Sequence, residues 1–142
     1  MRYLAIDYGD KRIGLAICDS AETIATPLAV TRGQKGLLRK IADIVKDENV
    51  DAIVLGLPLS MDGSESSQTR RVLGFAEQLK RHLDIPVHLQ DERLSSFDAE
   101  HTLALGKLTR GQKRKRLDAV AAAAILEAFL QTKRQDQAGL PC

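Results

Sequence analysis

The first nineteen residues constrain the fold most strongly, because two apolar runs are joined there by a short polar turn. Residues 2–7 and 13–19 have the composition of β-strands, and Gly9 with the aspartate after it can adopt the positive φ angles that a tight hairpin needs. A third strand is expected over 23–31, where Pro27 indicates an edge strand or a bulge. The chain therefore begins with three antiparallel strands.

The hydrophobic period changes after residue 33, and helices and strands then alternate. Apolar residues fall on one helical stripe from Gln34 onward, whereas the run DAIVLGLP at 51–58 is continuous and is typical of a strand buried on both faces. The order of elements is βββαβαβαα, which predicts a mixed sheet with helices on both faces. The remaining expected elements are helices over 66–83, 95–106 and 117–133 and a strand over 85–91.

Composition limits the class of protein. The chain has 142 residues, of which 44% are hydrophobic and 28% charged, as in an ordinary globular domain. We expect that domain over 1–132, followed by a flexible tail at 133–142. No apolar run is long enough to span a membrane and no signal segment is evident, so a cytoplasmic protein without a membrane partner is expected. Cys18, Cys142 and three scattered histidines provide neither a disulfide framework nor a zinc site.

A basic segment lies between the last two expected helices. It contains six cations and no acid within ten residues, so the net charge of +2 conceals an otherwise acidic chain. Its members are Lys107, Arg110, Lys113, Arg114, Lys115 and Arg116. Such a segment is often only a solvated loop, and the alternative is a polyanion-binding surface. The aromatic content of 4% argues against binding by base stacking, so phosphate contacts are expected.

Three acids occupy comparable positions in this plan of elements. Asp7 interrupts the first apolar strand, Glu92 follows the last strand, and Asp118 lies in the first turn of the alanine-rich helix. If the first strand is central, the three acids meet at one edge of the sheet. Each also has an ordinary alternative: a turn-starting aspartate for Asp7, an ion pair with Arg93 or Lys107 for Glu92, and a favourable helix-dipole charge for Asp118.

A cluster of this kind indicates a divalent metal site. Carboxylates brought together in a partly buried place raise one another's pKa unless a cation neutralises them. Hard oxygen ligands without histidine or cysteine favour Mg²⁺ or Mn²⁺. Two such ions roughly 3.5–4 Å apart, present with the substrate, would stabilise both the attacking and the leaving oxygen of a phosphodiester.

The motifs together are similar to those of the YqgF/RuvX family, within the ribonuclease H-like superfamily. The matching stretches are IDYGDKRIGLA at 6–16, GLPLSMDGSES at 56–66, DERLSS at 91–96 and LDAVAAAAIL at 117–126. They occur in this order, and the resemblance covers residues 2–131, nearly the whole chain. It implies a ribonuclease H-like mixed sheet of five strands, three antiparallel and then two parallel, with helices on both faces.

The resemblance also implies a metal-dependent endonuclease in which Asp7, Glu92 and Asp118 are catalytic and bind the metal. The related Holliday-junction resolvases carry their second acid at the end of the fourth strand. This chain has Gly56 there, so the role falls to Glu92 on the next strand, with Asp91 as an alternative ligand. On a regular strand Asp91 and Glu92 face opposite ways, so only one of them can point at Asp7.

The family offers two substrates for such an endonuclease. Bacterial members are described as acting in 5′-end maturation of pre-16S rRNA during ribosome biogenesis, and the older family name records Holliday junction resolution. The expected partner is thus structured RNA or branched DNA, bound by a monomer or a homodimer. Two rival interpretations are a non-catalytic nucleic-acid-binding module and a sugar-kinase-like ATPase. The kinase fold needs two lobes, and 142 residues supply only one.

Further polar residues of the motifs are candidates for contact with nucleic acid. Lys11, Arg12 and Arg93 are expected to bind phosphates near the acids, with ordinary solvated charges as the alternative. Gly9 makes the turn that precedes Lys11. Three serines of the polar loop between the fourth strand and the second long helix are candidates for lining the substrate entrance, or belong to a plain mobile connection: Ser60, Ser64 and Ser66.

Overall fold

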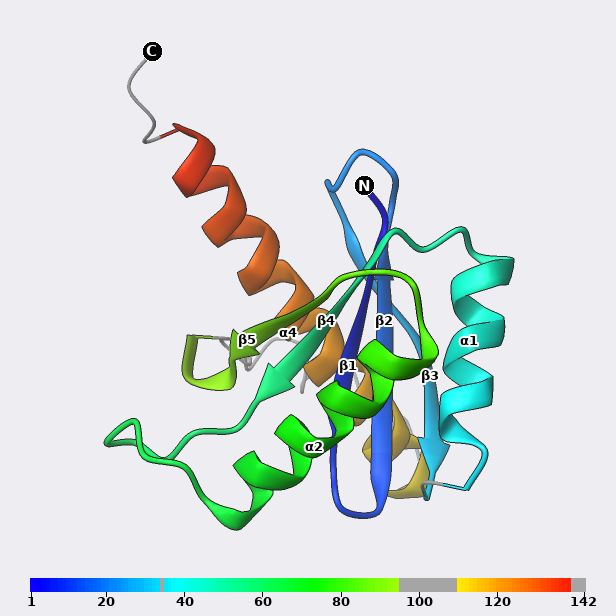
Figure 1. The fold of residues 1–142 in the computed structure, drawn as a ribbon, viewed down its shortest axis with the longest axis vertical. Helices are drawn as coiled ribbons and strands as arrows, with labels where there is room; N and C mark the ends of the chain where they lie inside the picture. Colours follow the sequence, from blue (N-terminus) through cyan, green and yellow to red (C-terminus); the bar gives the residue numbers. More distant parts are fainter. Residues whose placement is uncertain (34, 95–109, 139–142) are drawn as a thin grey trace.

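The computed structural model describes residues 1–33, 35–94 and 110–138. Its centre is one mixed sheet with the strand order β3-β2-β1-β4-β5 (Figure 1). The strands are β1 (Tyr3–Tyr8), β2 (Arg12–Cys18), β3 (Ala25–Arg32), β4 (Ala52–Leu57) and β5 (Val87–Asp91). The β1–β2 and β2–β3 pairs are antiparallel, and the β1–β4 and β4–β5 pairs are parallel. The predicted five-stranded mixed sheet with a central first strand is confirmed.

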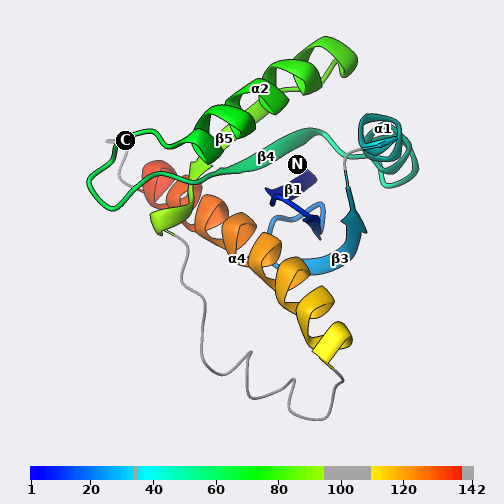
Figure 2. The ribbon, with the colours of Figure 1, turned by 90° about the horizontal axis from the view of Figure 1, so that it is seen from below.

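Helices cover both faces of this sheet (Figure 2). The helices α1 (Leu37–Asp47) and α2 (Ser67–His82) pack on one face, and α4 (Arg110–Ala138) crosses the other. Alternate residues of β1 divide between the two cores because successive side chains of a strand point to opposite faces. Leu4 and Ile6 are buried beside α1 and α2, whereas Tyr3 and Ala5 are buried beside α4.

Local sequence signals explain where these elements begin and end. Ser66 caps α2 in a capping box with Thr69, whose hydroxyl accepts a hydrogen bond from the Ser66 backbone N–H. Strand β3 lies at an edge of the sheet, and its register with β2 shifts between Leu15 and Ala16, the residue that pairs with Pro27. The expectation that Pro27 marks an edge strand or a bulge is therefore confirmed.

The last helix is longer than the sequence predicted. It begins at Arg110 rather than at residue 117, so the backbone of most of the basic segment is helical, and Asp118 is not in its first turn. It also continues to Ala138, through residues expected in a tail. Lys133 explains part of this extension, because its Nζ donates hydrogen bonds to Tyr3 Oη (2.7 Å) and Glu22 Oε1 (2.6 Å).

Some expectations fall outside the described residues. The short helix predicted over 95–106 and the cation Lys107 belong to this group, as do the side chains of residues 110–118. Among the helices that the structure describes, none combines the length and the apolar composition needed to cross a membrane.

Candidate active site

Asp7 projects from the central strand toward the face that α4 covers. It shares this side of β1 with Tyr3 and Ala5, and its side chain is half-buried. In the antiparallel pairing Asp7 lies opposite Gly14 of β2. In the parallel pairing the last matched residue of β4 is Leu55, so Gly56 follows beside Asp7 on that side. Glycine positions on both neighbouring strands leave room around the carboxylate.

Glu92 reaches the same face of the sheet from the end of β5. It begins a short 3₁₀ helix, η1 (Glu92–Leu94), directly after the strand. A Cβ atom built on Gly56 would lie 2.7 Å from Glu92 Oε1 and 2.7 Å from Cδ1 of Ile125 on α4. The space above Gly56 is therefore filled by the Glu92 carboxylate and an apolar side chain, and no larger residue fits there without displacing them.

The carboxyl groups of Asp7 and Glu92 are hydrogen-bonded to each other. The pKa of Glu92 is raised to about 7, first by burial and then by the charge of Asp7, the hydrogen bond with Asp7 and the charge of Asp91. Two carboxyl groups this close favour a shared proton or a bound cation over two bare negative charges. The pair thus has the electrostatic character expected of a cation site.

Asp91 faces a different partner. Its carboxylate accepts hydrogen bonds from Nε and Nη2 of Arg93, with Nη2–Oδ2 at 2.7 Å. These hydrogen bonds lower the pKa of Asp91 and raise that of Arg93. Asp91 pairs with Leu57 in the sheet, on the side opposite Gly56. The structure therefore places Glu92, and not Asp91, beside Asp7.

The third predicted acid is described only through its backbone. Position 118 lies in α4 one turn before Ala122 and two turns before Ile125, two residues that are buried against the sheet. Ile125 lies over Gly56, the residue of β4 beside Asp7. The Asp118 side chain lies outside the described part. Among the described side chains, no group of three or more acids, histidines or cysteines is close enough to hold a metal ion.

The donor set of the described pair fits a hard divalent cation. It consists of carboxylate oxygens alone, which are the ligands that Mg²⁺ and Mn²⁺ prefer. Burial and the neighbouring charges of Asp7 and Asp91 raise the pKa of Glu92, and a bound cation would offset this repulsion. Asp7 and Glu92 are consequently suited to hold such an ion.

Basic residues flank the pair at the β1–β2 turn. The positive φ angles expected at Gly9 and Asp10 are not found. Gly9 instead donates its N–H to the Arg12 carbonyl at 3.1 Å, and a Cβ on Gly9 would lie 2.5 Å from that oxygen, so the turn requires glycine for space. Gly9, Asp10, Lys11 and Arg12 line a shallow cavity of about 360 Å³. Arg12 lies two residues before Gly14 on β2 and hence on the same face as Asp7. The turn thus brings positive charge to the acidic end of β1.

The serines of the loop after β4 are engaged within the chain. The loop is a hydrogen-bonded turn, in which the Ser60 N–H donates to the Ser64 carbonyl and the Gly63 N–H donates to the Ser60 carbonyl. The Ser64 hydroxyl donates to Asp62, and the Ser66 hydroxyl caps α2. The loop therefore has its own hydrogen-bonded shape, which its composition alone did not indicate.

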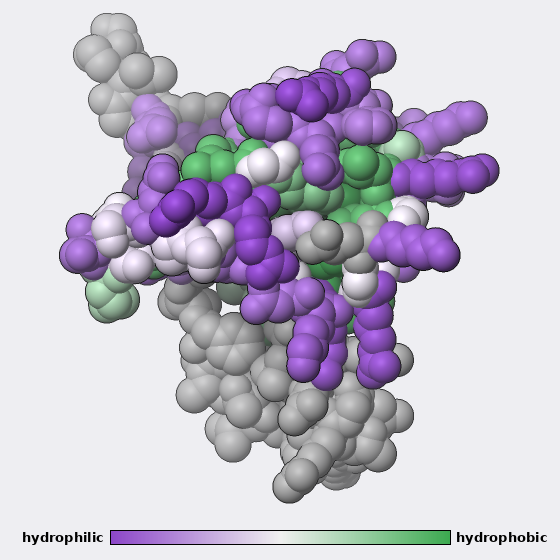
Figure 3. Space-filling model, turned by 60° about the horizontal axis from the view of Figure 1, so that its bottom comes forward, coloured by the Kyte–Doolittle hydropathy of each residue, from purple (hydrophilic) through white to green (hydrophobic). Residues whose placement is uncertain are grey.

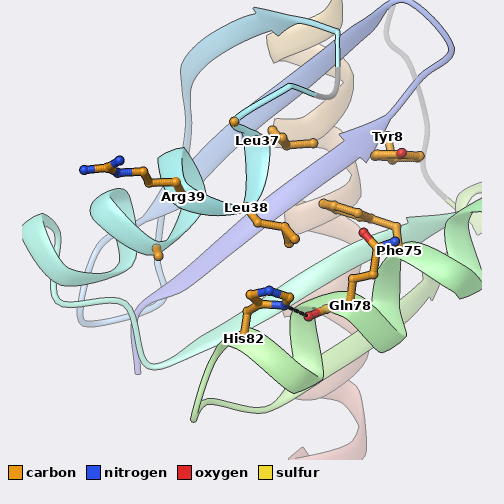
Figure 4. Close-up of a pocket in the computed structure, with 9 residues that line it drawn as sticks. Tyr8, Leu37, Leu38, Arg39, Phe75, Gln78 and His82 are labelled. Carbon is orange, nitrogen blue, oxygen red and sulfur yellow. Dashed lines mark hydrogen bonds between the residues drawn. The ribbon is translucent and has the colours of Figure 1, made fainter.

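A larger cavity of about 510 Å³ lies on the opposite side of the sheet, between α1 and α2 (Figure 4). Its lining includes Leu37, Leu38 and the rings of Tyr8 and Phe75, which are stacked 4.3 Å apart. Surface hydropathy is mixed on this side of the molecule, where apolar surface forms a central band bordered by hydrophilic side chains (Figure 3). The sheet separates this cavity from the face of Asp7 and Glu92.

Comparison with known sequences identifies close relatives over nearly the whole chain. A family model described as "RuvX: Holliday junction resolvase" matches residues 1–132. A protein of Maridesulfovibrio salexigens is 43% identical over 132 residues, which cover 92% of this chain and 98% of the relative. A protein of an Anaeromyxobacter species is 45% identical over 132 residues, covering 92% and 96%. Both relatives carry the name "Putative pre-16S rRNA nuclease".

Solved structures share the fold at low sequence identity. RuvC of Thermus thermophilus aligns with a TM-score of 0.58 and 14% identity, over 94% of this chain and 97% of RuvC. The Holliday junction resolvase of fowlpox virus aligns with a TM-score of 0.54 and 16% identity, over 93% and 99%. These similarities confirm the predicted fold class.

Proposed function

Since the chain belongs to the RuvX family over residues 1–132, we propose that this range is a single nuclease domain that hydrolyses phosphodiester bonds with divalent cations. Its proposed role is the 5′-end maturation of pre-16S rRNA in the cytoplasm, in line with the names of relatives that are 43% and 45% identical. The observation that carries the proposal is the hydrogen-bonded pair of Asp7 and Glu92 at the acidic end of the central strand.

In this proposal Asp7, Glu92 and Asp118 hold one or two Mg²⁺ or Mn²⁺ ions. The ions supply an activated water and charge stabilisation for in-line attack on the phosphorus. The chain contributes a rigid mounting for the ligands, because Asp7 is fixed by pairing on both sides of β1. Glu92 Oε1 and Ile125 Cδ1 both lie 2.7 Å from the place of a Cβ on Gly56, so the glycine leaves room for the carboxylate.

The cations of the chain bind the nucleic acid in this mechanism. Lys11 and Arg12 hold a phosphate near the scissile bond, at the turn that follows Asp7. Lys107, Arg110 and the run 113–116 bind flanking phosphates, which position the substrate without reading its sequence. The protein acts as a monomer or a homodimer, and neither alternative changes the assignment of the acids.

A second candidate function is cleavage of branched DNA as a Holliday junction resolvase. The description of the matching family and the RuvC-like fold favour it. A third is nucleic-acid binding without turnover. The close approach of Asp7 and Glu92 argues against this third candidate, because two neighbouring, partly buried carboxyl groups lower the stability of a fold unless they serve a function.

A comparison of the two substrates under one set of conditions tests the proposed function. The purified protein is incubated with a pre-16S rRNA 5′ leader and with a four-way DNA junction, each with Mg²⁺ or Mn²⁺. An Asp7→Asn variant purified in parallel gives the background of contaminating nuclease. Faster cleavage of the leader by the wild type alone supports the rRNA role. Faster cleavage of the junction would assign the protein to recombination instead.

A further inference from the structure

The two residues that flank Glu92 are bonded to each other. Asp91 Oδ1 accepts hydrogen bonds from the Arg93 backbone N–H (2.9 Å) and from its Nε (3.1 Å), and Oδ2 accepts from Nε (3.0 Å) and Nη2 (2.7 Å). These hydrogen bonds close a short ring that includes the backbone of Glu92. Because Asp91 and Arg93 are held together, the backbone of Glu92 is restrained, and its carboxylate stays directed at Asp7.

The same guanidinium also reaches the loop after β4. Arg93 Nη1 donates a hydrogen bond to the Met61 carbonyl at 3.3 Å. It also lies 3.6 Å from the place of a Cβ on Gly63, whose φ is +86°. Gly63 therefore suits the turn by its backbone angle and lies against Arg93. One side chain thus joins the end of β5, the turn that carries Glu92, and the loop between β4 and α2.

The position of β5 explains why such a connection matters. This strand lies at the edge of the sheet, so among the described strands it pairs only with β4. Glu92 lies just beyond its last paired residue, Asp91. The ends of edge strands open easily. Without further contacts, Glu92 would therefore not be held firmly beside Asp7. The hydrogen bonds of Arg93 to Asp91 and Met61 provide the missing support.

We propose that Asp91 and Arg93 form a positioning unit that holds Glu92 and the 60–64 loop in place, and that Arg93 is not a phosphate ligand. The proposal rests on the proposed function, since that function gives Glu92 its role. The geometry favours it because the guanidinium is already committed to a bidentate carboxylate and a carbonyl. A substrate phosphate would have to compete with both.

The experiment compares Arg93→Lys with the wild type by two measurements. Lysine keeps the charge but cannot make the bidentate fork. Hydrogen exchange, which needs no substrate, is expected to accelerate at the amides of Ser60 and Gly63, whose hydrogen bonds define the loop. In cleavage assays kcat is expected to fall by roughly tenfold to a hundredfold, as a misplaced catalytic group would cause, with KM and its salt dependence unchanged.

Two further variants sharpen the result. Asp91→Asn and the Asp91→Asn/Arg93→Lys double variant should lose about the same kcat as Arg93→Lys, because each removes the same unit. Arg2→Lys is the matched control. Arg2 also joins a carboxylate and backbone carbonyls, those of Glu48 and Cys18, at the opposite end of β1. It should leave the exchange of the 60–64 loop and kcat unaltered.

Contrary results are distinct from a failure of the proposed function. Unchanged exchange at Ser60 and Gly63 in Arg93→Lys would overturn the positioning role. So would an unchanged kcat with a higher KM and a shallower dependence of binding on salt, which identify a phosphate contact. If the wild type itself cleaves nothing, the proposed function fails, and the exchange measurement still decides whether the pair holds the loop.

Discussion

Each described carboxylate of the candidate site is accommodated by glycine on a neighbouring strand. Asp7 lies opposite Gly14 and beside Gly56, and Glu92 occupies the space that a side chain at Gly56 would fill. In the sequence, Gly56 stands where the related resolvases carry an acid. The structure explains this difference: Glu92, at the end of the adjacent strand, fills the space above Gly56, and a side chain at Gly56 would displace it.

Substitution of Gly56 tests this packing. Gly56→Ala should displace Glu92 and Ile125, lower the free energy of unfolding by about 1–3 kcal/mol through overpacking, and abolish most of the cleavage activity. Chemical denaturation and cleavage rates measure the two effects. Gly74→Ala is the matched control, because a Cβ there meets nothing within 4 Å. The free energy of unfolding of that variant should rise by roughly 0.5–1 kcal/mol, because Gly74 lies inside a helix and alanine is the better helix former. Full activity in Gly56→Ala would refute the role assigned to this glycine.

Substitutions of Asp91 and Glu92 should reduce the cleavage rate to different extents. Glu92→Gln should reduce the cleavage rate by much more than Asp91→Asn, because Glu92 shares a hydrogen bond with Asp7 while Asp91 is bonded to Arg93. Rates are measured with both variants at the same metal concentration. The reverse order would transfer the proposed ligand to Asp91.

Sequence patterns predict the bounds of most helices and strands, whereas tertiary contacts determine the length of α4. The strands and the first two helices follow from hydrophobic period and turn residues, and their predicted bounds differ from the structure by a few residues. The length of α4 does not follow from period, because its ends are charged and polar. Its C-terminal part is held by contacts far along the chain, such as Lys133 with Glu22.

The ion pair of Lys133 and Glu22 predicts a pH-dependent contribution to stability. The hydrogen bond from Lys133 lowers the pKa of Glu22, so the stabilisation is present above the carboxyl's unfolded pKa and is lost as the pH falls through its lowered value. Glu22→Gln should cost about 1 kcal/mol or less at pH 7 and nothing in strong acid. Denaturation at several pH values measures this. Glu77→Gln, which removes an exposed ion pair with Lys80, is the control and should lower the free energy of unfolding by less. An equal loss in both variants would contradict the stabilising role assigned to the Lys133–Glu22 pair.

The basic segment predicts a salt-dependent contribution to binding. Replacing Lys113, Arg114, Lys115 and Arg116 with alanine should weaken nucleic-acid binding and flatten its dependence on salt, because log affinity falls with log salt by about 0.7–0.9 per phosphate neutralised. Binding is measured at several salt concentrations, and the far-UV circular dichroism should be unchanged. Equal affinity at every salt concentration would exclude these cations from substrate binding.

At the scale of the whole molecule, sequence and structure agree on the order and direction of the strands. The order of apolar runs predicted the mixed sheet, and the parity of strand residues predicted that only one of Asp91 and Glu92 could face Asp7. Sequence did not reveal the bonds of Arg93 to Asp91 and Met61, since a surface arginine beside two acids has several possible partners. It also did not reveal the cavity between α1 and α2, which depends on how the two helices pack.

The central claim is that Asp7 and Glu92 form the metal-dependent centre of a nuclease. The most direct measurement is the rate at which wild type and Asp7→Asn, purified in parallel, cleave a structured pre-16S rRNA leader with Mg²⁺, with Mn²⁺ and with a chelator. The account predicts cleavage by the wild type with either metal, none with the chelator, and a rate at least roughly a hundredfold lower for Asp7→Asn. Equal trace activity in both proteins would contradict it and leave only nucleic-acid binding.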